Sequence, residues 1–398
     1  MALIEVGASD YVGNLRFSHG RGARCWTTDG REYIDLICGQ GPVVLGHAHP
    51  AVTAAVVRQL EQGTMLPGPG PAFYQLRDVL IGLYPHNDDL LTFKTGSEAV
   101  AAAMRLARAF TGRDTVLRVG FHGWHDQVIS PYVRCHSYDP ATFEESWPLG
   151  VPHPAYTDLV RVWHGWDPDG LISLVRATGQ QLAAVIIDPV QLAPPAGPAM
   201  AHDLTRAIKD AGALLIFDES KTGFRVHLGG FQALYDVAGD LTVLSKALAN
   251  GLPLAVVLGR RDLIALAQRA RIKGTFGAET ASIAAALATV ETLAAEDAPR
   301  VLNETGTQLI NGLNEVITSV GLQEHVSAVP YHWACMPYIR FTGSAQPLED
   351  AFFFGLVRRG VLMLRDHMSY VSLALTTADV NRVMVAAHGA LLELVGGA

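Results

Sequence analysis

Two residues whose types could do chemistry stand at the end of short apolar runs: Asp218 follows its run directly, and Lys246 follows after Ser245. Such runs, here 213–217 and 241–244, are typical of buried β-strands. A lysine at the end of a buried strand is costly unless its ammonium is paired or its amine is neutral. A neutral, desolvated lysine is a nucleophile that forms Schiff bases. The alternative is a lysine that simply turns outward into water.

The elements that carry these two residues favour the first interpretation. In an open α/β sheet, the ends of consecutive strands lie at one edge, and ligands bind there. Asp218 and Lys246 could therefore face the same cofactor. Pyridoxal phosphate requires such a pair, because a lysine binds its aldehyde and an acid keeps its ring nitrogen protonated.

A third stretch, residues 90–98, predicts an anion site. A short strand ends at Gly96, and a strongly helical segment follows from Glu98. We expect Ser97 to be the helix N-cap, while Gly96 lets a ligand approach the backbone closely. Free N–H groups and the helix dipole at this end attract phosphate. The alternative is an ordinary helix cap that binds nothing.

Further strand ends add candidate residues. Phe121 follows the run 115–119 and a glycine, where it could stack on a flat ring or simply belong to the core. Asp188 ends the apolar run 183–187. We interpret residues 136–158 as a long irregular loop over the site. Loops of this length are uncommon in compact domains, which suggests a function. We expect helices near 51–62, 202–211, from Thr280, at 286–296 and at 301–319.

Composition limits the classes of protein that the chain can represent. It has 398 residues, 49% of them hydrophobic and 17% charged, which suits one large domain and a smaller one. A net charge of −8 argues against nucleic acid as the main partner. We find no apolar run of about 18 residues that could span a membrane, and we expect no signal peptide. The expected location is the cytoplasm, with reduced cysteines.

We expect no metal site from the sequence. The chain has 4 cysteines without a close pair, and its two close histidine pairs lack a Cys or carboxylate set that would complete a ligand shell. The residues considered are Cys25, Cys38, Cys135, Cys335, His47 with His49, and His122 with His125.

The order of these motifs resembles the class III aminotransferases, which are fold-type I pyridoxal-phosphate enzymes, and most closely their glutamate-1-semialdehyde aminomutase branch. The resemblance covers nearly the whole chain. It implies an α/β fold: a large domain with a mostly parallel seven-stranded sheet flanked by helices, and a smaller α+β domain built from both termini. The implied boundaries are 1–50 and 286–398 for the small domain and 51–285 for the large one. The segments that carry it are 29–35, 41–50, 95–99, 121–123, 217–225, 245–246 and 274–275.

The resemblance also implies roles for matching residues. Lys246 would be the Schiff-base lysine, and Asp218 the partner of the pyridinium nitrogen. Gly96 and Ser97 would hold the cofactor phosphate, and Phe121 would stack on the ring. Gly274 and Thr275 would reach the phosphate of the partner subunit's cofactor, so a homodimer is implied. His122 and Ser220 complete the expected cofactor contacts.

The chain departs from the family pattern at several positions, which bear on the substrate. Ser220 stands where a valine usually packs on the ring, and Asp188 where glutamate is usual. The segment 361–370 matches only loosely. Arginines at the site would suit a substrate carboxylate, although each could instead form a surface or interdomain salt bridge. The candidate substrate contacts are Trp124, His125, Arg225, Arg365 and His367.

We therefore expect an aminotransferase that moves an amino group from an amino acid, glutamate or glutamine, to an aldehyde or ketone by a ping-pong mechanism. A sugar-like acceptor from natural-product or antibiotic biosynthesis would suit the polar loop. An aminomutase or epimerase that uses the same cofactor is the main alternative, and a non-catalytic protein of this fold is a second. A nicotinamide-dependent dehydrogenase would need a glycine fingerprint after the first strand, and the sequence lacks it. The acceptor and the stereochemistry stay open.

Overall fold

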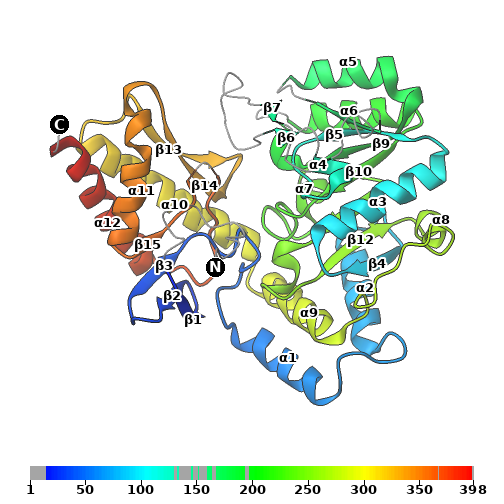
Figure 1. Cartoon of the computed structure of the whole chain (residues 1–398), viewed down its shortest axis with the longest axis horizontal. Coiled ribbons are helices and arrows are strands. Elements are labelled where there is room, and N and C mark those ends of the chain that lie inside the picture. Colours follow the sequence, from blue (N-terminus) through cyan, green and yellow to red (C-terminus); the bar gives the residue numbers. More distant parts are fainter. Residues whose placement is uncertain are drawn as a thin grey trace. The chain divides into compact units, whose positions relative to one another are not determined.

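The computed structural model describes residues 15–129, 132–133, 145–146, 151, 159–163, 167–192, 197–365 and 367–396. Apart from the strand β7 (Glu145–Ser146) and Val151, the predicted irregular loop 136–158 lies outside these residues. The chain divides into two compact units, Met1–Thr53 with Leu293–Ala398, and Ala54–Thr292. Figure 1 labels most of the elements of both units.

The unit 54–292 contains a seven-stranded sheet with the order β4-β12-β11-β10-β9-β5-β8. Only β12 runs against its neighbours, β11 and β4, and the other neighbouring strands pair in parallel. The predicted mostly parallel seven-stranded sheet is therefore confirmed. The strands are β4 (Asp89–Phe93), β5 (Thr115–Val119), β8 (Val160–Val162), β9 (Leu182–Ile187), β10 (Leu214–Asp218), β11 (Leu241–Leu244) and β12 (Ala255–Gly259).

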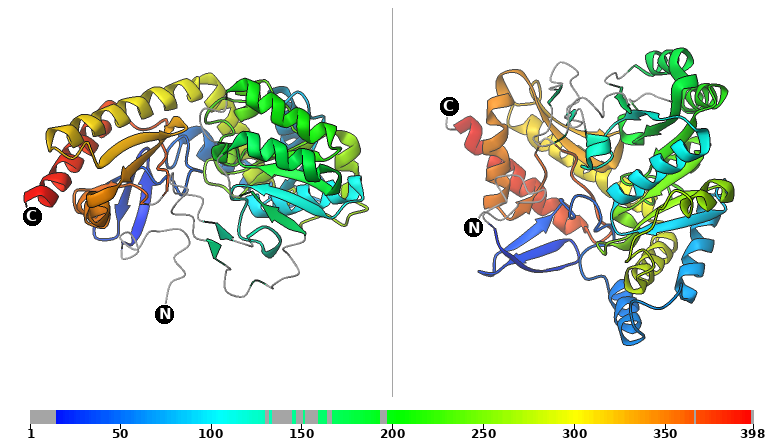
Figure 2. Two further views of the ribbon diagram at one scale, coloured as in Figure 1. Left: turned by 90° about the horizontal axis from the view of Figure 1, so that it is seen from above. Right: turned by 45° about the vertical axis from the view of Figure 1, so that its right-hand side comes forward.

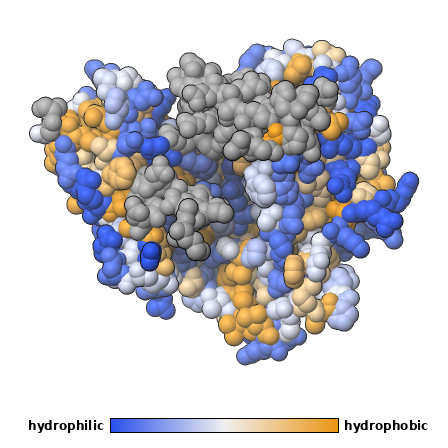
Figure 3. All heavy atoms as spheres, viewed as in Figure 1, coloured by the Kyte–Doolittle hydropathy of each residue, from blue (hydrophilic) through white to orange (hydrophobic). Residues whose placement is uncertain are grey.

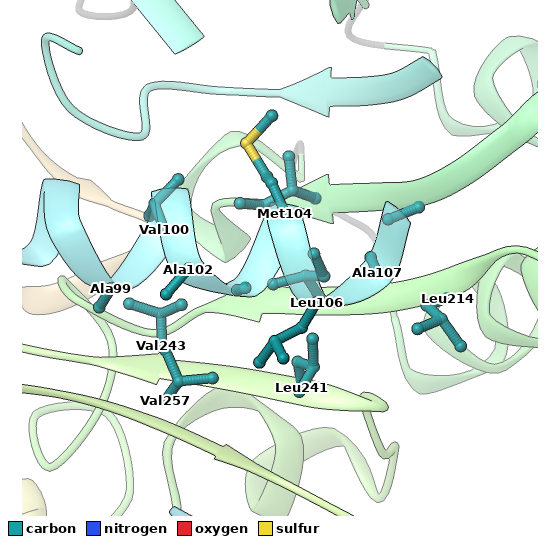
Figure 4. Close-up of a cluster of buried hydrophobic side chains, with 14 of the residues drawn as sticks. Ala99, Val100, Ala102, Met104, Leu106, Ala107, Leu214, Leu241, Val243 and Val257 are labelled. Atoms are coloured by element: carbon teal, nitrogen blue, oxygen red, sulfur yellow. The ribbon is translucent and has the colours of Figure 1, made fainter. Parts of the chain in front are cut away.

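The apolar runs of the sequence become the central strands of this sheet because both of its faces are covered. Every residue of β9, β10, β11 and β12 is buried, as expected for strands flanked by helices. The helix α3 (Gly96–Thr111) packs on one face, and its small side chains, such as Ala99 and Ala102, let it approach the strands closely. Figure 4 shows this core, with Val243 of β11 and Val257 of β12 below the helix.

Further helices surround the sheet. The helices α5 and α6 pack on each other and lie side by side in Figures 1 and 2. The short strands β6 (Tyr132–Val133) and β7 form an antiparallel pair. The helices are α1 (Pro50–Glu61), α2 (Pro71–Leu83), α4 (Asp126–Ile129), α5 (Pro168–Thr178), α6 (Pro198–Asp210), α7 (Gly230–Tyr235), α8 (Arg261–Ile264) and α9 (Thr280–Ala295), with 3-10 turns at η2 (Gly179–Gln181), η3 (Pro189–Gln191), η4 (Lys246–Ala249) and η5 (Ala265–Ala267).

The other unit combines both ends of the described chain. Its four-stranded sheet has the order β1-β2-β3-β15, and β13 and β14 form a separate antiparallel pair. The long helix α10 packs against β13 and β14, as both views of Figure 2 show. The elements are β1 (Phe17–Arg21), β2 (Arg24–Thr27), β3 (Glu32–Asp35), α10 (Ala298–Ser319), β13 (Val326–Tyr331), β14 (Trp333–Phe341), η6 (Gly343–Leu348), α11 (Glu349–Arg358), β15 (Val361–Leu362) and α12 (Thr377–Gly396).

Several predicted helix limits are wrong. The segment 286–296 is not a separate helix, because α9 runs unbroken from Thr280. The helices α6 and α10 begin earlier than predicted, with Pro198 and Pro299 in their first turns, where proline has no hydrogen bond to lose. Among the described residues, the structure contains no helix that is long and apolar enough to cross a membrane.

Candidate active site

Asp218 and Lys246 lie at the ends of neighbouring parallel strands. Asp218 is the last residue of β10, and it stands opposite Val243 of β11 in the strand register. Lys246 follows β11 after one residue and begins the turn η4. Parallel pairing of two short buried strands thus brings both functional groups to the same edge of the sheet, as the sequence predicts.

Lys246 combines a strained backbone with a perturbed amine. Its φ of 39° lies in the left-handed region, which costs a residue other than glycine about 1–2 kcal/mol and is characteristic of functional sites. The residue is of intermediate exposure, so it is enclosed but can be reached by a solute. Burial, together with the positive charge of Lys221, lowers the pKa of its ammonium from 10.5 to about 8.

Asp218 is held by a histidine. Its Oδ2 lies 2.9 Å from Nδ1 of His122, and its Oδ1 accepts a hydrogen bond from the Ser220 amide. The other ring nitrogen of His122 lies 3.1 Å from the Val119 carbonyl oxygen, which fixes the ring. Burial alone would raise the pKa of Asp218, but the contact with His122 and the Ser220 hydrogen bonds outweigh it and lower the pKa. The carboxylate thus keeps its negative charge although the residue is only 4% exposed.

A second buried ion pair, which we did not predict, lies beside these groups. Lys221 donates from Nζ to Oδ2 of Asp188 over 2.6 Å, and both side chains are almost fully buried. Asp188 also caps η3 at the end of β9. The Lys221 ammonium lies 6.0 Å from the centre of the Phe121 ring. The sequence showed Asp188 as a departure from the family pattern, but nothing in the spacing indicated Lys221 as its partner.

The predicted anion site is built differently from the prediction. Ser97 is not the N-cap of α3. Thr95 is the cap, because its hydroxyl accepts the Glu98 amide while the Glu98 side chain accepts the Thr95 amide. This reciprocal pairing is the capping box. Gly96 and Ser97 therefore occupy the first turn of the helix, where free N–H groups point outward.

Hydroxyl groups surround this helix end. A Cβ added to Gly96 would lie 3.4 Å from Ser245 Oγ and 3.5 Å from Ser220 Oγ. A Cβ added to Gly123, whose φ is 103°, would lie 2.1 Å from Ser97 Oγ. These contacts place three serines around the start of α3. Ser245 was missed because its only signal is that it precedes Lys246.

The remaining predicted residues of this unit separate into buried and exposed groups. Arg225 is fully buried at 0% exposure, so a surface salt bridge is excluded, and its charge contributes to lowering the Lys246 pKa. Trp124 is 71% exposed and its ring meets the ring of His125 edge-on. Thr275 and Gly274 lie in an exposed turn before α9.

Two predicted substrate contacts, Arg365 and His367, belong to the other unit. Arg365 forms an ion pair with Asp350, which is the salt-bridge alternative considered for it. Nδ1 of His367 lies 2.7 Å from the Met368 carbonyl oxygen.

The carboxylate of Glu219, next to Asp218, takes part in hydrogen bonds that stabilise the fold. It accepts hydrogen bonds from the Phe231 and Gln232 amides at the start of α7 and from the Thr222 hydroxyl. Burial raises its pKa, although these hydrogen bonds oppose the shift. Of the two adjacent acids, only Asp218 shares the strand edge with Lys246.

The donor set suits pyridoxal phosphate. It combines an amine of lowered pKa, a buried charged carboxylate, an aromatic side chain, and a helix N-terminus lined by serine hydroxyls. Together with the seven-stranded sheet, this set defines the class of fold-type I pyridoxal-phosphate enzymes.

Comparisons with known proteins identify the family. The family model for class-III aminotransferases matches residues 8–377. Glutamate-1-semialdehyde 2,1-aminomutase of Methanosarcina acetivorans is 32% identical over 385 residues, 92% of this chain and 89% of that protein. The 3-aminobutyryl-CoA aminotransferase of Cloacimonas acidaminovorans is 30% identical over 392 residues, 95% of this chain and 89% of that protein. An omega-transaminase structure from Sphaerobacter thermophilus superposes with a TM-score of 0.86 at 25% identity, covering 100% of this chain and 94% of that chain.

The chain belongs to the class-III aminotransferases. The predicted family, fold and enzyme class are confirmed, and pyridoxal 5′-phosphate is the cofactor.

Proposed function

We propose that Lys246 is the residue that binds the cofactor covalently and moves the proton during transamination, and that Asp218 is the partner of the cofactor's ring nitrogen. The observation that carries this proposal is that both pKa values are lowered at one strand edge, which favours a neutral amine at Lys246 and a charged carboxylate at Asp218. The Lys246 amine has a pKa of about 8, while the Asp218 carboxylate is held charged by His122.

When bound, pyridoxal phosphate supplies an aldehyde that condenses with amines and a protonated ring that accepts the electrons of a broken bond. Lys246 Nζ would hold the cofactor through that aldehyde in the resting enzyme. Once free, this amine would take a proton from the amino-bearing carbon of the substrate. A base works best when its pKa is near the working pH, and a pKa of about 8 meets this condition.

The phosphate would bind at the first turn of α3. The amides of Gly96 and Ser97 and the hydroxyl of Ser245 supply donors there, and the helix dipole adds attraction for an anion. Phe121 would cover one face of the ring. Ser220 would lie near the opposite face, where its smaller side chain packs less tightly than the valine usual in the family.

A homodimer is part of the proposal. Large hydrophobic side chains are exposed on α1 and the segment that follows it, including Val57, Leu60, Met65 and Leu66. A hydrophobic area in the lower part of Figure 3 lies in this region. The Thr280 amide donates to the Thr64 carbonyl oxygen, so this surface adjoins the turn with Thr275 and the 58% exposed Phe276. Such patches mark interfaces, and Thr275 would then reach the phosphate bound by the partner subunit.

We infer that the amino donor is an amino acid, glutamate or glutamine, and that the acceptor is an aldehyde or ketone. A donor carboxylate would be recognised by a guanidinium, and buried Arg225 lies close enough to act on the Lys246 charge. Arg365 is the weaker candidate, because its guanidinium already pairs with Asp350. Trp124, His125 and His367 complete the proposed substrate contacts. A sugar-like acceptor from natural-product biosynthesis and a cytoplasmic location stay part of this proposal.

The alternative is a 1,2-aminomutase or epimerase, which is favoured by the identity with the aminomutase of M. acetivorans. The two reactions separate in one experiment on the cofactor-loaded enzyme. With glutamate alone, an aminotransferase releases one equivalent of keto acid per site and stops until an acceptor is added. Release of an isomer of the substrate without an acceptor would favour the alternative. No spectral change with any donor or aldehyde would refute both.

The residue roles are tested with Lys246→Ala. This variant should bind the cofactor without the covalent link and lose nearly all turnover, because no other amine takes the proton. Lys209→Ala, which removes an exposed lysine of α6, is the matched control. Full activity in Lys246→Ala would end the proposal for this residue.

A further inference from the structure

Three potential metal ligands converge in the unit formed by Met1–Thr53 and Leu293–Ala398. They are the thiol of Cys25 in β2, the carboxylate of Asp35 at the end of β3, and the imidazole of His47. Cys25 Sγ lies 3.2 Å from His47 Nε2, and Asp35 Oδ2 lies 2.8 Å from the same nitrogen. The sulfur and the carboxylate oxygen are 3.8 Å apart. All three ligand atoms therefore surround one point.

These distances are close to those of ligands on a single zinc ion. Zinc binds sulfur at about 2.3 Å and nitrogen or oxygen at about 2.0–2.2 Å, so tetrahedral ligands lie about 3.3–3.6 Å from each other. The observed separations differ from these values by about half an ångström or less. A mixed set of thiolate, imidazole and carboxylate suits zinc better than magnesium or calcium, which prefer oxygen ligands alone.

The arrangement differs from that of a nucleophilic triad. In a triad, the histidine uses one ring nitrogen for the nucleophile and the other for the acid. Here Cys25 and Asp35 face the same nitrogen of His47.

The backbone holds the three groups in place. Asp35 Oδ1 accepts the amides of Ile37 and Cys38, which leaves Oδ2 facing the other two ligands. The backbone of His47 exchanges two hydrogen bonds with Gly22. Gly20 is needed beside the imidazole, because a Cβ at this position would lie 2.6 Å from His47 Cγ. Such support orients ligands before a metal arrives.

We propose that Cys25, Asp35 and His47 bind one zinc ion, with water as the fourth ligand. The His47 side chain is 25% exposed and that of Asp35 7%, so solvent reaches the cluster from the side of the histidine. The ion would tie β2, β3 and the segment before α1 together. This proposal departs from the expectation of no metal, which did not consider Cys25 and Asp35 as partners of His47 because they are distant in the sequence.

The test uses the full-length, cofactor-loaded enzyme prepared without a histidine tag. The protein is stripped with a chelator, supplied with zinc, and dialysed against metal-free buffer before zinc is counted per chain. We expect one zinc per chain in the wild type and at least tenfold less in Cys25→Ser and His47→Gln. His19→Gln, which removes a histidine of neighbouring β1, should retain the ion. Circular dichroism and the cofactor absorbance verify folding of each variant.

Cobalt gives a spectroscopic readout in the wild-type protein itself. A cobalt ion in the wild-type site should show a thiolate charge-transfer band and the intense visible bands of a tetrahedral complex. The band should be absent in Cys25→Ser. Three results would each overturn the proposal. The wild type could fail to retain zinc, all four proteins could retain it equally as an adventitious ion only, or cobalt could bind without a thiolate band.

Discussion

Replacing Lys246 with methionine should stabilise the cofactor-free protein, although it removes the proposed catalytic amine. The lowering of the Lys246 pKa from 10.5 to about 8 means that the folded state resists protonation of this amine. A change of this size corresponds to about 3 kcal/mol at most, and the partial exposure of the side chain reduces it to about 1–3 kcal/mol. Methionine has similar length and no charge, so it avoids this penalty.

The sign of the effect fixes its pH dependence. Below about pH 8 both the folded and unfolded chains bind the proton, and the folded wild type carries the whole penalty. Between about pH 8 and 10.5 the unfolded chain binds a proton that the folded chain lacks, so the stability of the wild type rises with pH. Above about pH 10.5 neither state is protonated, and the penalty is gone. The advantage of Lys246→Met should therefore be largest near pH 7 and vanish near pH 10.5.

The assay is urea unfolding of both cofactor-free proteins at equal concentration, followed by circular dichroism across this pH range. Midpoints are compared, because a chain of two units need not unfold in one step. Lys209→Met, an exposed substitution in α6, should show no such pH-dependent difference. The reasoning is refuted if Lys246→Met is less stable than the wild type near pH 7, or if its advantage does not change with pH.

Three further substitutions probe the same strand edge. Asp218→Asn should keep the covalent link to the cofactor but lower kcat by about 10²-fold or more, because the ring nitrogen loses its charged partner; kcat and the absorbance of the bound cofactor test this. Lys221→Met should lower the free energy of unfolding by about 3–5 kcal/mol, since it leaves the Asp188 carboxylate buried alone; urea unfolding, with Lys221→Arg as the charge-conserving control, measures the loss. Gly123→Ala should lower stability by about 1–2 kcal/mol through its positive φ and weaken cofactor affinity by displacing Ser97, as cofactor titration would show.

Specific results would contradict each of these expectations. Wild-type kcat in Asp218→Asn would remove the acid from the mechanism. A loss below about 1 kcal/mol in Lys221→Met would mean that the ion pair is replaced easily. Unchanged cofactor affinity in Gly123→Ala would place the phosphate away from Ser97.

The strand ends were predictable from the sequence because buried strands have a recognisable apolar pattern. The runs before Asp218 and Lys246 are apolar without alternation, as strands covered on both faces require. A charged residue after such a run is a local signal. The parallel register of β10 and β11 then brings the two charged residues to the same edge of the sheet. The lysine and the acid were therefore found without any knowledge of side-chain contacts.

Contacts set by the fold were harder to predict. The cap at Thr95 was missed because Ser97 has equal cap propensity, and only the Glu98 contact decides between them. Lys221 and Asp188 pair because β9 and β10 are neighbours in the sheet. The order of the strands in a sheet cannot be deduced from the sequence alone. Neither contact follows from residue spacing alone.

The cluster of Cys25, Asp35 and His47 shows the same limit in the other unit. Its members come from two strands and a loop, and they meet only because β2 pairs with β3 and Gly22 pairs with His47. The three residues are not close in the sequence, whereas the ligands of a typical zinc motif are close enough to be recognised by their spacing.

The most direct test of the central claim is to find which lysine binds the cofactor. The holoenzyme is treated with borohydride, which makes the carbon–nitrogen link permanent, and its peptides are analysed by mass spectrometry. The account predicts the reduced cofactor on Lys246 alone. Cofactor mass on Lys221, a buried lysine beside this site, would contradict it.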